Sequence, residues 1–206
     1  MAFTFFFRDL QMLELAVDHV APELAGRSRP KIWDAGCAMG PEPFTLAILL
    51  AGRLGHFAFR NLRIAATDID ETSQFGNIVR EAVYPAGDLE RMPAGTLEQY
   101  FEPANVSGTY RLDDRIRASV HFQQHDLLSL REVDCGFSLV VCKNVLLHFS
   151  QPQRVEVIRM FHRALGPGGY FVTEHTQKLP PEASPWFEQV VPHGQLFRKS
   201  EVAECA

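Results

Sequence analysis

The sequence predicts an α/β fold in which helices cover both faces of a doubly wound, mostly parallel sheet. Apolar runs of strand length alternate with helical patterns along most of the chain, and glycine-bearing turns separate them. One segment, 84–119, interrupts this rhythm with closely spaced prolines and glycines. Alternating strands and helices need crossover connections, and these produce a parallel sheet covered on both sides.

The first part of the chain contains two strand–turn–helix units. Apolar residues at helical spacing predict the first helix, and Pro41 suits the first turn of a helix because its missing N–H is not needed there. The expected elements are a helix Leu10–Val20, a strand Lys31–Ala35, a turn Gly36–Gly40, a helix from Pro41 to about Ala51 that stops at Gly52, a strand Leu62–Thr67, and a helix from about Glu71 to Glu81.

The interrupting segment is expected to form a small antiparallel sheet, because short alternating stretches lie between its turn residues. We therefore divide the chain into a main domain, residues 1–84 and 120–206, and an inserted β-subdomain, residues 85–119. The expected elements after the insertion are strands Val120–His125 and Phe137–Lys143, a helix Gln153–Leu165, a sharp turn Gly166–Gly169, a strand Tyr170–Glu174, and a terminal hairpin of Phe187–Val191 and Gln195–Lys199.

Composition limits the classes of partner. The 206 residues carry a net charge of −5 without a long basic run, so no nucleic-acid partner is expected. No apolar run approaches the roughly 20 residues that span a bilayer, and the first residues lack the features of a signal peptide. We expect a cytoplasmic protein without membrane insertion. Widely spaced cysteines predict packed free thiols and no metal site; they are Cys37, Cys135, Cys142 and Cys205.

The turn after the first predicted strand is the main candidate ligand site. Gly36 and Gly40 permit a sharp turn and close approach of a ligand, but the pattern lacks the central glycine of a dinucleotide-binding turn. Glu42 follows at the helix start, where a carboxylate repels phosphate but accepts hydrogen bonds from a cationic amino group. This favours S-adenosylmethionine over NAD. A tight turn without any ligand is the alternative.

Polar residues follow three further predicted strands. Asp68 is placed to accept both ribose hydroxyls of an adenosine, with Asp70 as a neighbouring candidate that better suits a helix cap. Asp126 could meet the adenine edge or cap the turn after it. Asn144 could contact ligand or satisfy loop backbone.

These residues lie in segments that resemble the CheR family of methyltransferases. The resemblance runs from Thr4 to about Lys199, and its most specific parts match the patterns T-x-F-F-R and G-C-A-x-G-x-E-P. The matching segments are Thr4–Arg8, Ile32–Thr45, Ala66–Asp70, Val141–Val145 and Leu165–Tyr170.

The resemblance implies a fold and an activity. The fold would be the Rossmann-like class I methyltransferase sheet with a C-terminal hairpin and a small β-subdomain. The activity would be methyl transfer from S-adenosylmethionine to glutamate side chains on an acidic helix of a chemoreceptor's cytoplasmic region, with S-adenosylhomocysteine as product. Arg8 would lie near the transferred methyl group. The residues implied to contact the cofactor or its product are Thr4, Arg8, Glu42, Asp68, Asp126, Leu127, Asn144 and Val145.

Several features depart from the family pattern. The helical domain that precedes the family's catalytic domain is expected to be absent from this sequence. Asp34 replaces the usual serine, Lys143 the usual arginine, and His148 a tyrosine that lies near the methyl group in the family. The side facing the methyl acceptor therefore looks more altered than the cofactor side.

Two side chains are candidates for the chemistry. A carboxylate acceptor is ionised near neutral pH and needs no base, so Arg8 would only hold and align it, unless Arg8 forms an ordinary salt bridge. His148 could deprotonate a hydroxyl or amine acceptor, or simply pack between Leu147 and Phe149. A methyltransferase for a small molecule or another protein, and a non-catalytic S-adenosylmethionine-binding module, remain the alternatives.

Overall fold

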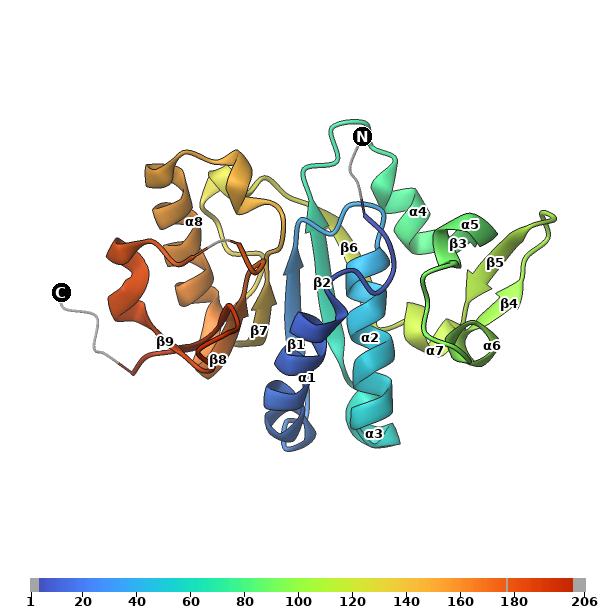
Figure 1. Ribbon diagram of the computed structural model, residues 1–206, viewed down its shortest axis with the longest axis horizontal. Helices are drawn as coiled ribbons and strands as arrows, with labels where there is room; N and C mark the ends of the chain where they lie inside the picture. Colours follow the sequence, from blue (N-terminus) through green and yellow to red (C-terminus); the bar gives the residue numbers. More distant parts are fainter. Residues whose placement is uncertain (1–3, 177, 202–206) are drawn as a thin grey trace.

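The computed structural model describes residues 4–176 and 178–201 and contains a seven-stranded sheet in the order β6-β2-β1-β7-β8-β10-β9 (Figure 1). The strands are β1 (Lys31–Ala35), β2 (Arg63–Asp68), β6 (Val120–Gln124), β7 (Phe137–Val141), β8 (Leu165–Val172), β9 (Phe187–Gln189) and β10 (Leu196–Lys199). The helices beside them are α1 (Leu10–Ala25), α2 (Pro41–Arg53), α3 (His56–Arg60), α4 (Phe75–Glu81) and α8 (Gln151–Ala164), with 3₁₀ turns η1 (Leu127–Ser129), η2 (Leu146–His148) and η3 (Pro181–Trp186).

The strand order confirms the predicted doubly wound sheet. β1 pairs in parallel with β2 on one side and with β7 on the other, and only β10 runs antiparallel, to β8 and to β9. The chain therefore moves outward from β1 in both directions. Such a reversal leaves a crevice at the carboxyl ends of the central strands, where doubly wound proteins bind ligands.

Alternate side chains of the central strands enter two apolar layers. Ile32 and Val141 pack toward α1 and α2, whereas Trp33 and Val140 pack toward α8. Both faces of β1 and β7 are buried, so apolar residues on these strands do not alternate with exposed polar ones, although β1 also buries Asp34 and β7 buries Ser138. Figure 1 shows α1 and α2 side by side against the sheet.

A small antiparallel sheet in the order β3-β5-β4 lies at the opposite end of the molecule from β9 (Figure 1). Its elements are β3 (Val83–Pro85), α5 (Ala86–Leu89), α6 (Thr96–Tyr100), β4 (Phe101–Pro103), β5 (Thr109–Leu112) and α7 (Asp114–Arg117). The antiparallel sheet that the sequence predicted is thus present. The division into a main domain and an inserted domain at 85–119 stays a prediction.

The predicted turn Gly166–Gly169 is wrong, because the segment forms part of a continuous strand. β8 begins at Leu165, opposite Phe137, and its next partner pair is Leu139 with Tyr170. The extra residues form a bulge, with Gly168 at φ 69°. A Cβ on Gly169 would lie 2.8 Å from the carbonyl oxygen of Phe137, so the glycines allow a bulge rather than a chain reversal.

Other boundaries shift by a few residues. The helix expected from Glu71 begins at Phe75, because the chain first turns through Ser73 at φ 55°. The helix α2 continues through Gly52 to Arg53. The helix α8 begins at Gln151, two residues earlier than expected, with a capping box formed by Ser150 and Gln153.

The cysteines agree only in part with their prediction. Cys37 and Cys142 are buried free thiols, whereas Cys135 is exposed, and Cys205 lies outside the described residues. In the part of the chain that the structure describes, no helix has both the length and the apolar character to cross a membrane. Nor do those residues bring three His, Cys, Asp or Glu side chains together as a metal-binding group.

Candidate active site

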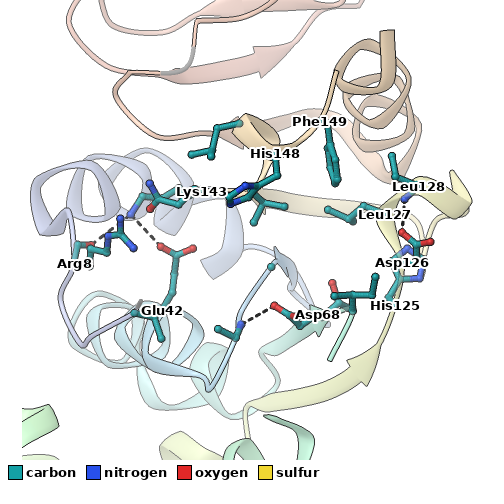
Figure 2. A pocket seen from close by; sticks show the side chains of 18 residues that line it. Arg8, Glu42, Asp68, His125, Asp126, Leu127, Leu128, Lys143, His148 and Phe149 are labelled. Carbon is teal, nitrogen blue, oxygen red and sulfur yellow. Dashed lines mark hydrogen bonds and ion pairs between the residues drawn. The ribbon is translucent and has the colours of Figure 1, made fainter. Parts of the chain in front are cut away.

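A cavity of about 620 Å³ lies at the carboxyl ends of β1, β2, β6 and β7. Figure 2 shows residues from these four strand ends and from the N-terminal segment facing one another across it. Its lining consists of Thr4, Arg8, Gly36, Ala38, Glu42, Thr67, Asp68, Ile69, His125, Asp126, Leu127, Leu128, Lys143, Asn144, Val145, Leu147, His148 and Phe149.

The cavity brings together every sequence-predicted site residue except Gly40. Gly40 instead precedes α2 at φ 98°, and a Cβ there would lie 3.0 Å from the Tyr84 hydroxyl and from a Val79 methyl group. Gly40 therefore permits the left-handed backbone of the turn and leaves room for Tyr84 and Val79. Eight further lining residues were not predicted as site residues from the sequence: Ala38, Thr67, Ile69, His125, Leu128, Lys143, Leu147 and Phe149.

Gly36 allows the glycine turn to lie directly under the cavity. Its φ is 101°, and its N–H donates to the Thr67 carbonyl at 2.7 Å. A Cβ on Gly36 would lie 2.1 Å from a methyl group of Val145, which also lines the cavity. A side chain here would therefore strain the backbone and displace a wall of the cavity.

Asp68 at the end of β2 is held in one orientation by two backbone donors. The N–H of Ala38 donates to Oδ2 at 3.0 Å and the N–H of Asp70 donates to Oδ1 at 3.1 Å. A carboxylate oxygen can accept more than one hydrogen bond, so both oxygens keep acceptor capacity toward the cavity. This fits two vicinal hydroxyls such as those of a ribose.

Asp70 is confirmed as the helix-capping residue. Its carboxylate accepts hydrogen bonds from the N–H groups of Gln74, Phe75 and Gly76 at 2.9–3.2 Å. Burial tends to raise the pKa of Asp70, but the three N–H donors outweigh it and hold the pKa below the ordinary value.

The opposite side of the cavity from Arg8 and Glu42 is mainly apolar. Leu127, Leu128 and Phe149 gather there in Figure 2 beside His125 and Asp126. Oδ1 of Asp126 accepts from the Leu128 N–H at 2.8 Å, so it caps the turn as one of its two predicted roles, while its side chain also lines the cavity. Burial lowers the pKa of His125 and favours the neutral imidazole.

Charged side chains meet at the other end of the cavity. The buried Lys143 ammonium lies 3.0 Å from Oε2 of Glu42, and Figure 2 shows both beside Arg8. Burial raises the pKa of Glu42, and the adjacent Lys143 charge offsets part of that rise. Glu42 also lines the cavity, and its role toward the amino group of a methionine moiety stays a prediction.

Asp34 lies fully buried beneath this end, on the Ile32 face of β1. None of the residues described by the structure forms a hydrogen bond with either of its carboxylate oxygens. Burial raises the pKa of Asp34 well above its usual range; Glu42 raises it further and Lys143 lowers it. The buried surroundings of Asp34 thus favour its neutral carboxyl over an uncompensated buried charge.

His148 and Asn144 line the cavity in the segment that follows β7. His148 is exposed in η2, at the rim rather than in packed interior, which removes the packing interpretation of this histidine. Asn144 has a left-handed backbone at φ 59°, and its N–H donates to Oε2 of Glu174 at 3.0 Å. That bond fixes the loop backbone and leaves the Asn144 side chain in the cavity lining.

The fold and the cavity define a class of protein. A doubly wound sheet that ends in an antiparallel hairpin, with a glycine turn, a strand-end aspartate and a helix-start carboxylate around one cavity, is the arrangement of a class I S-adenosylmethionine-dependent methyltransferase. The cavity volume also lies within the usual range for small-molecule and cofactor sites.

Sequence comparison identifies the family. Residues 2–194 match the family described as "CheR methyltransferase, SAM binding domain", and the chain belongs to this family. It is an S-adenosylmethionine-dependent methyltransferase, as the resemblance implied.

Curated relatives have similar names. The chain is 28% identical to a probable chemotaxis protein methyltransferase of Rhizobium etli, over 91% of this chain and 72% of the relative. It is 29% identical to chemotaxis protein methyltransferase 2 of Vibrio cholerae, over 96% and 67%, respectively. It is 32% identical to chemotaxis protein methyltransferase 2 of Pseudomonas aeruginosa, over 85% and 63%.

Solved structures show more distant similarity. A TehB-like S-adenosylmethionine-dependent methyltransferase from Corynebacterium glutamicum has a TM-score of 0.48 at 15% identity, over 88% of this chain and 83% of that one. The N-methyltransferase NodS from Bradyrhizobium japonicum, in complex with S-adenosyl-L-homocysteine, has a TM-score of 0.43 at 16% identity, over 80% and 58%.

Proposed function

We propose that the protein transfers the methyl group of S-adenosylmethionine to a glutamate side chain of a chemoreceptor-like protein, on an acidic cytoplasmic helix. The observation that carries this proposal is the cavity with Asp68 at the end of β2, Glu42 at the start of α2 and Arg8 at its edge. The names of the curated relatives, chemotaxis protein methyltransferases, support the acceptor class. A cytoplasmic location is part of the same proposal.

The lining suggests a role for each predicted residue. Asp68 would accept the ribose hydroxyls, and Glu42 the methionine amino group. Asp126 and Leu127 would flank the adenine, while Gly36 and Val145 would permit close approach. Thr4 and Asn144 would complete the cofactor site from the N-terminal segment and from the end of β7. These roles are proposals that rest on the position of each residue in the cavity lining.

Arg8 would carry out the alignment that this reaction needs. The cofactor, when bound, supplies an electrophilic methyl group on a sulfonium, and a glutamate carboxylate is already ionised near neutral pH. No residue has to remove a proton. The guanidinium of Arg8 can hold the acceptor carboxylate by charge-assisted hydrogen bonds, with one oxygen directed at the methyl group. Fixing two reactants in line can supply several kcal/mol of the barrier reduction.

The proposal is tested with labelled S-adenosylmethionine and purified cytoplasmic fragments of chemoreceptors. We expect transfer of label to glutamate side chains, released by mild base because the product is an ester. Arg8→Ala should lower kcat by well over tenfold while the far-ultraviolet circular dichroism stays unchanged. Absence of base-labile label on every receptor fragment tried would contradict the proposed acceptor.

A second candidate function is favoured by the exposure of His148 at the cavity rim. An imidazole in this place could act as a general base for a hydroxyl or amine acceptor on a small molecule or another protein. The histidine replaces a residue that is tyrosine in the family pattern, so the acceptor side differs from that pattern at this point.

The effect of His148→Tyr on kcat separates the two candidates. With a carboxylate acceptor, activity should be kept or raised, because no proton is transferred. With a hydroxyl or amine acceptor, the loss should be about 10²–10⁴-fold, and wild-type kcat should fall at low pH as the imidazole protonates. A carboxyl acceptor combined with a large loss in His148→Tyr would contradict the mechanism proposed for glutamate.

A further inference from the structure

The backbone on both sides of Arg8 has an unfavourable conformation. Phe7 has φ 58° and Asp9 has φ 50°, so two residues other than glycine are in the left-handed region, one before and one after Arg8. Such residues persist where surrounding contacts hold them, and they concentrate at functional sites. The position of Arg8 therefore depends on the contacts that hold this turn.

The part of the turn before Arg8 is anchored in the core. The N–H of Phe7 donates to Oγ1 of Thr45 in α2 at 3.0 Å. Phe6 is fully buried and packs edge-on against Tyr84, with ring centroids 4.9 Å apart. These contacts fix where the segment enters the turn, but neither of them reaches Arg8 or Asp9.

Lys143 adds contacts at Arg8 and Asp9, beside the N–H groups of Met12 and Leu13, which donate to the carbonyl oxygen of Asp9 at 2.9 and 3.3 Å. Its ammonium donates to the carbonyl oxygen of Arg8 at 3.4 Å and lies 3.3 Å from Oδ2 of Asp9. The third neighbour is Oε2 of Glu42 at 3.0 Å. The Lys143 side chain has no exposed surface, and it joins the end of β7 to two segments far away in the sequence (Figure 2).

We propose that Lys143 is a positioning residue, which holds Arg8 at the edge of the cavity and links it to Glu42. A lysine ammonium has three donors, and three oxygen neighbours from two distant segments surround this one. The inference rests on the proposed function, because the importance of Arg8 for the acceptor comes from it. The placement of Arg8 by Lys143 can nevertheless be measured without any methyl acceptor.

The competing explanation is that Lys143 only neutralises buried carboxylates. Glu42 and Asp34 both lie within its electrostatic reach, so its removal would disturb them as well. Three variants separate the two roles. Lys143→Met removes the ammonium, Lys143→Arg keeps a cation with several donors, and Asp9→Asn weakens one arm without leaving a buried charge. Lys31→Met is the control, since it breaks the exposed pair of Lys31 with Asp134.

Hydrogen exchange of residues 4–12 tests positioning without any methyl acceptor. In Lys143→Met, we expect exchange of this segment to rise by about tenfold or more, with wild-type rates in Lys143→Arg and in Lys31→Met. Asp9→Asn should give a smaller rise, and it serves as the test if Lys143→Met does not fold. Unchanged exchange of residues 4–12 in Lys143→Met, or in Asp9→Asn when only that variant folds, would overturn the proposal.

A double-mutant cycle on kcat tests whether Lys143 acts through Arg8. We expect Lys143→Met to lower kcat about tenfold or more, with recovery in Lys143→Arg, and to add almost nothing when Arg8 is already alanine. Additive losses in the double variant would overturn the proposal. If no receptor fragment is methylated by the wild type, the proposed acceptor fails, while the exchange experiment still decides the role of Lys143.

Discussion

At the residue scale, Asp34 and Asp70 are two buried aspartates whose pKa values shift in opposite directions. Neither oxygen of Asp34 has a hydrogen-bond partner among residues 4–176 and 178–201, whereas Asp70 accepts three backbone N–H bonds. Burial without a donor penalises the ionised carboxylate, and hydrogen bonding to the carboxylate favours it. The two residues therefore predict opposite dependences of stability on pH.

The unfolding free energy of Asp34→Asn should increase, relative to that of wild type, as pH rises. The pKa of Asp34 is raised in the folded state, so its contribution to stability is present below its unfolded pKa and is lost as pH rises through the folded value. Asparagine has no such loss. The measurement is urea unfolding of both proteins at about pH 5 and about pH 8. If the difference in unfolding free energy between the two proteins does not change with pH, the pKa of Asp34 is not raised in the folded state.

Asp70→Ala should destabilise the protein at neutral pH by about 1–3 kcal/mol, because three N–H groups at the start of α4 lose their acceptor. The pKa of Asp70 is lowered in the folded state, so its contribution is present above the unfolded pKa and is lost as pH falls through the folded value. Chemical unfolding at neutral pH and near pH 3 checks both points. An equal deficit at the two pH values would show that the carboxylate charge is not involved.

Some residues of the cavity could be predicted from the sequence, and others could not. Asp68 was found because ligands of doubly wound sheets bind at the carboxyl ends of the strands, and Glu42 because it follows the glycine turn at the start of the next helix. Lys143 was noted only as a replacement for arginine, because a lysine at the end of an apolar strand usually indicates a side chain exposed to solvent. Its burial depends on Glu42 and Asp9, which lie more than a hundred residues away in the sequence.

At the element scale, the turn between β1 and α2 requires a glycine at position 36, whereas the helix α2 does not require the glycine that it contains. Gly36→Ala would combine φ 101° with a Cβ 2.1 Å from a Val145 methyl group. We expect it to weaken S-adenosylhomocysteine binding by at least about tenfold, because Val145, which lines the cavity, would be displaced. Titration calorimetry measures the loss, with circular dichroism as the check on folding.

Gly52→Ala is the matched control for that experiment. Gly52 lies inside α2 with an ordinary helical backbone, and a Cβ there would meet nothing within 4 Å. Alanine should leave binding unchanged and stabilise the protein by about 0.5–1 kcal/mol, since glycine is unfavourable within a helix. Equal binding by Gly36→Ala and Gly52→Ala would show that the turn does not shape the cofactor site.

Elements with one dominant local signal were predicted well. The strand Lys31–Ala35 has the predicted bounds, and Pro41 opens α2 as expected. Elements whose form depends on a partner strand were not. The glycines of 166–169 indicate a turn in isolation, but pairing of Phe137 with Leu165 keeps the segment in the sheet as a bulge. The register of a segment with a distant strand cannot be predicted from the residues of that segment alone.

At the scale of the whole molecule, the cavity exists because β1 lies at the point where the strand order reverses. One side of it comes from β2 and β6 and the other from β7, and the N-terminal segment brings Arg8 to its edge. The alternation of strands and helices predicted this edge of the sheet as the ligand site. It did not predict that the residues before α1 would close the cavity, because no periodic pattern marks the path of an irregular segment.

The central claim is that this cavity holds the adenosine and methionine parts of the cofactor between Asp68 and Glu42, and calorimetric titration with S-adenosylhomocysteine tests it most directly. We predict saturable binding of one molecule per chain to the wild type. Asp68→Asn, which keeps one acceptor oxygen and loses the other, should bind about ten- to a hundredfold more weakly, equivalent to about 1–3 kcal/mol. Absence of binding to folded wild type at high micromolar concentration, or unchanged affinity in Asp68→Asn, would contradict the account.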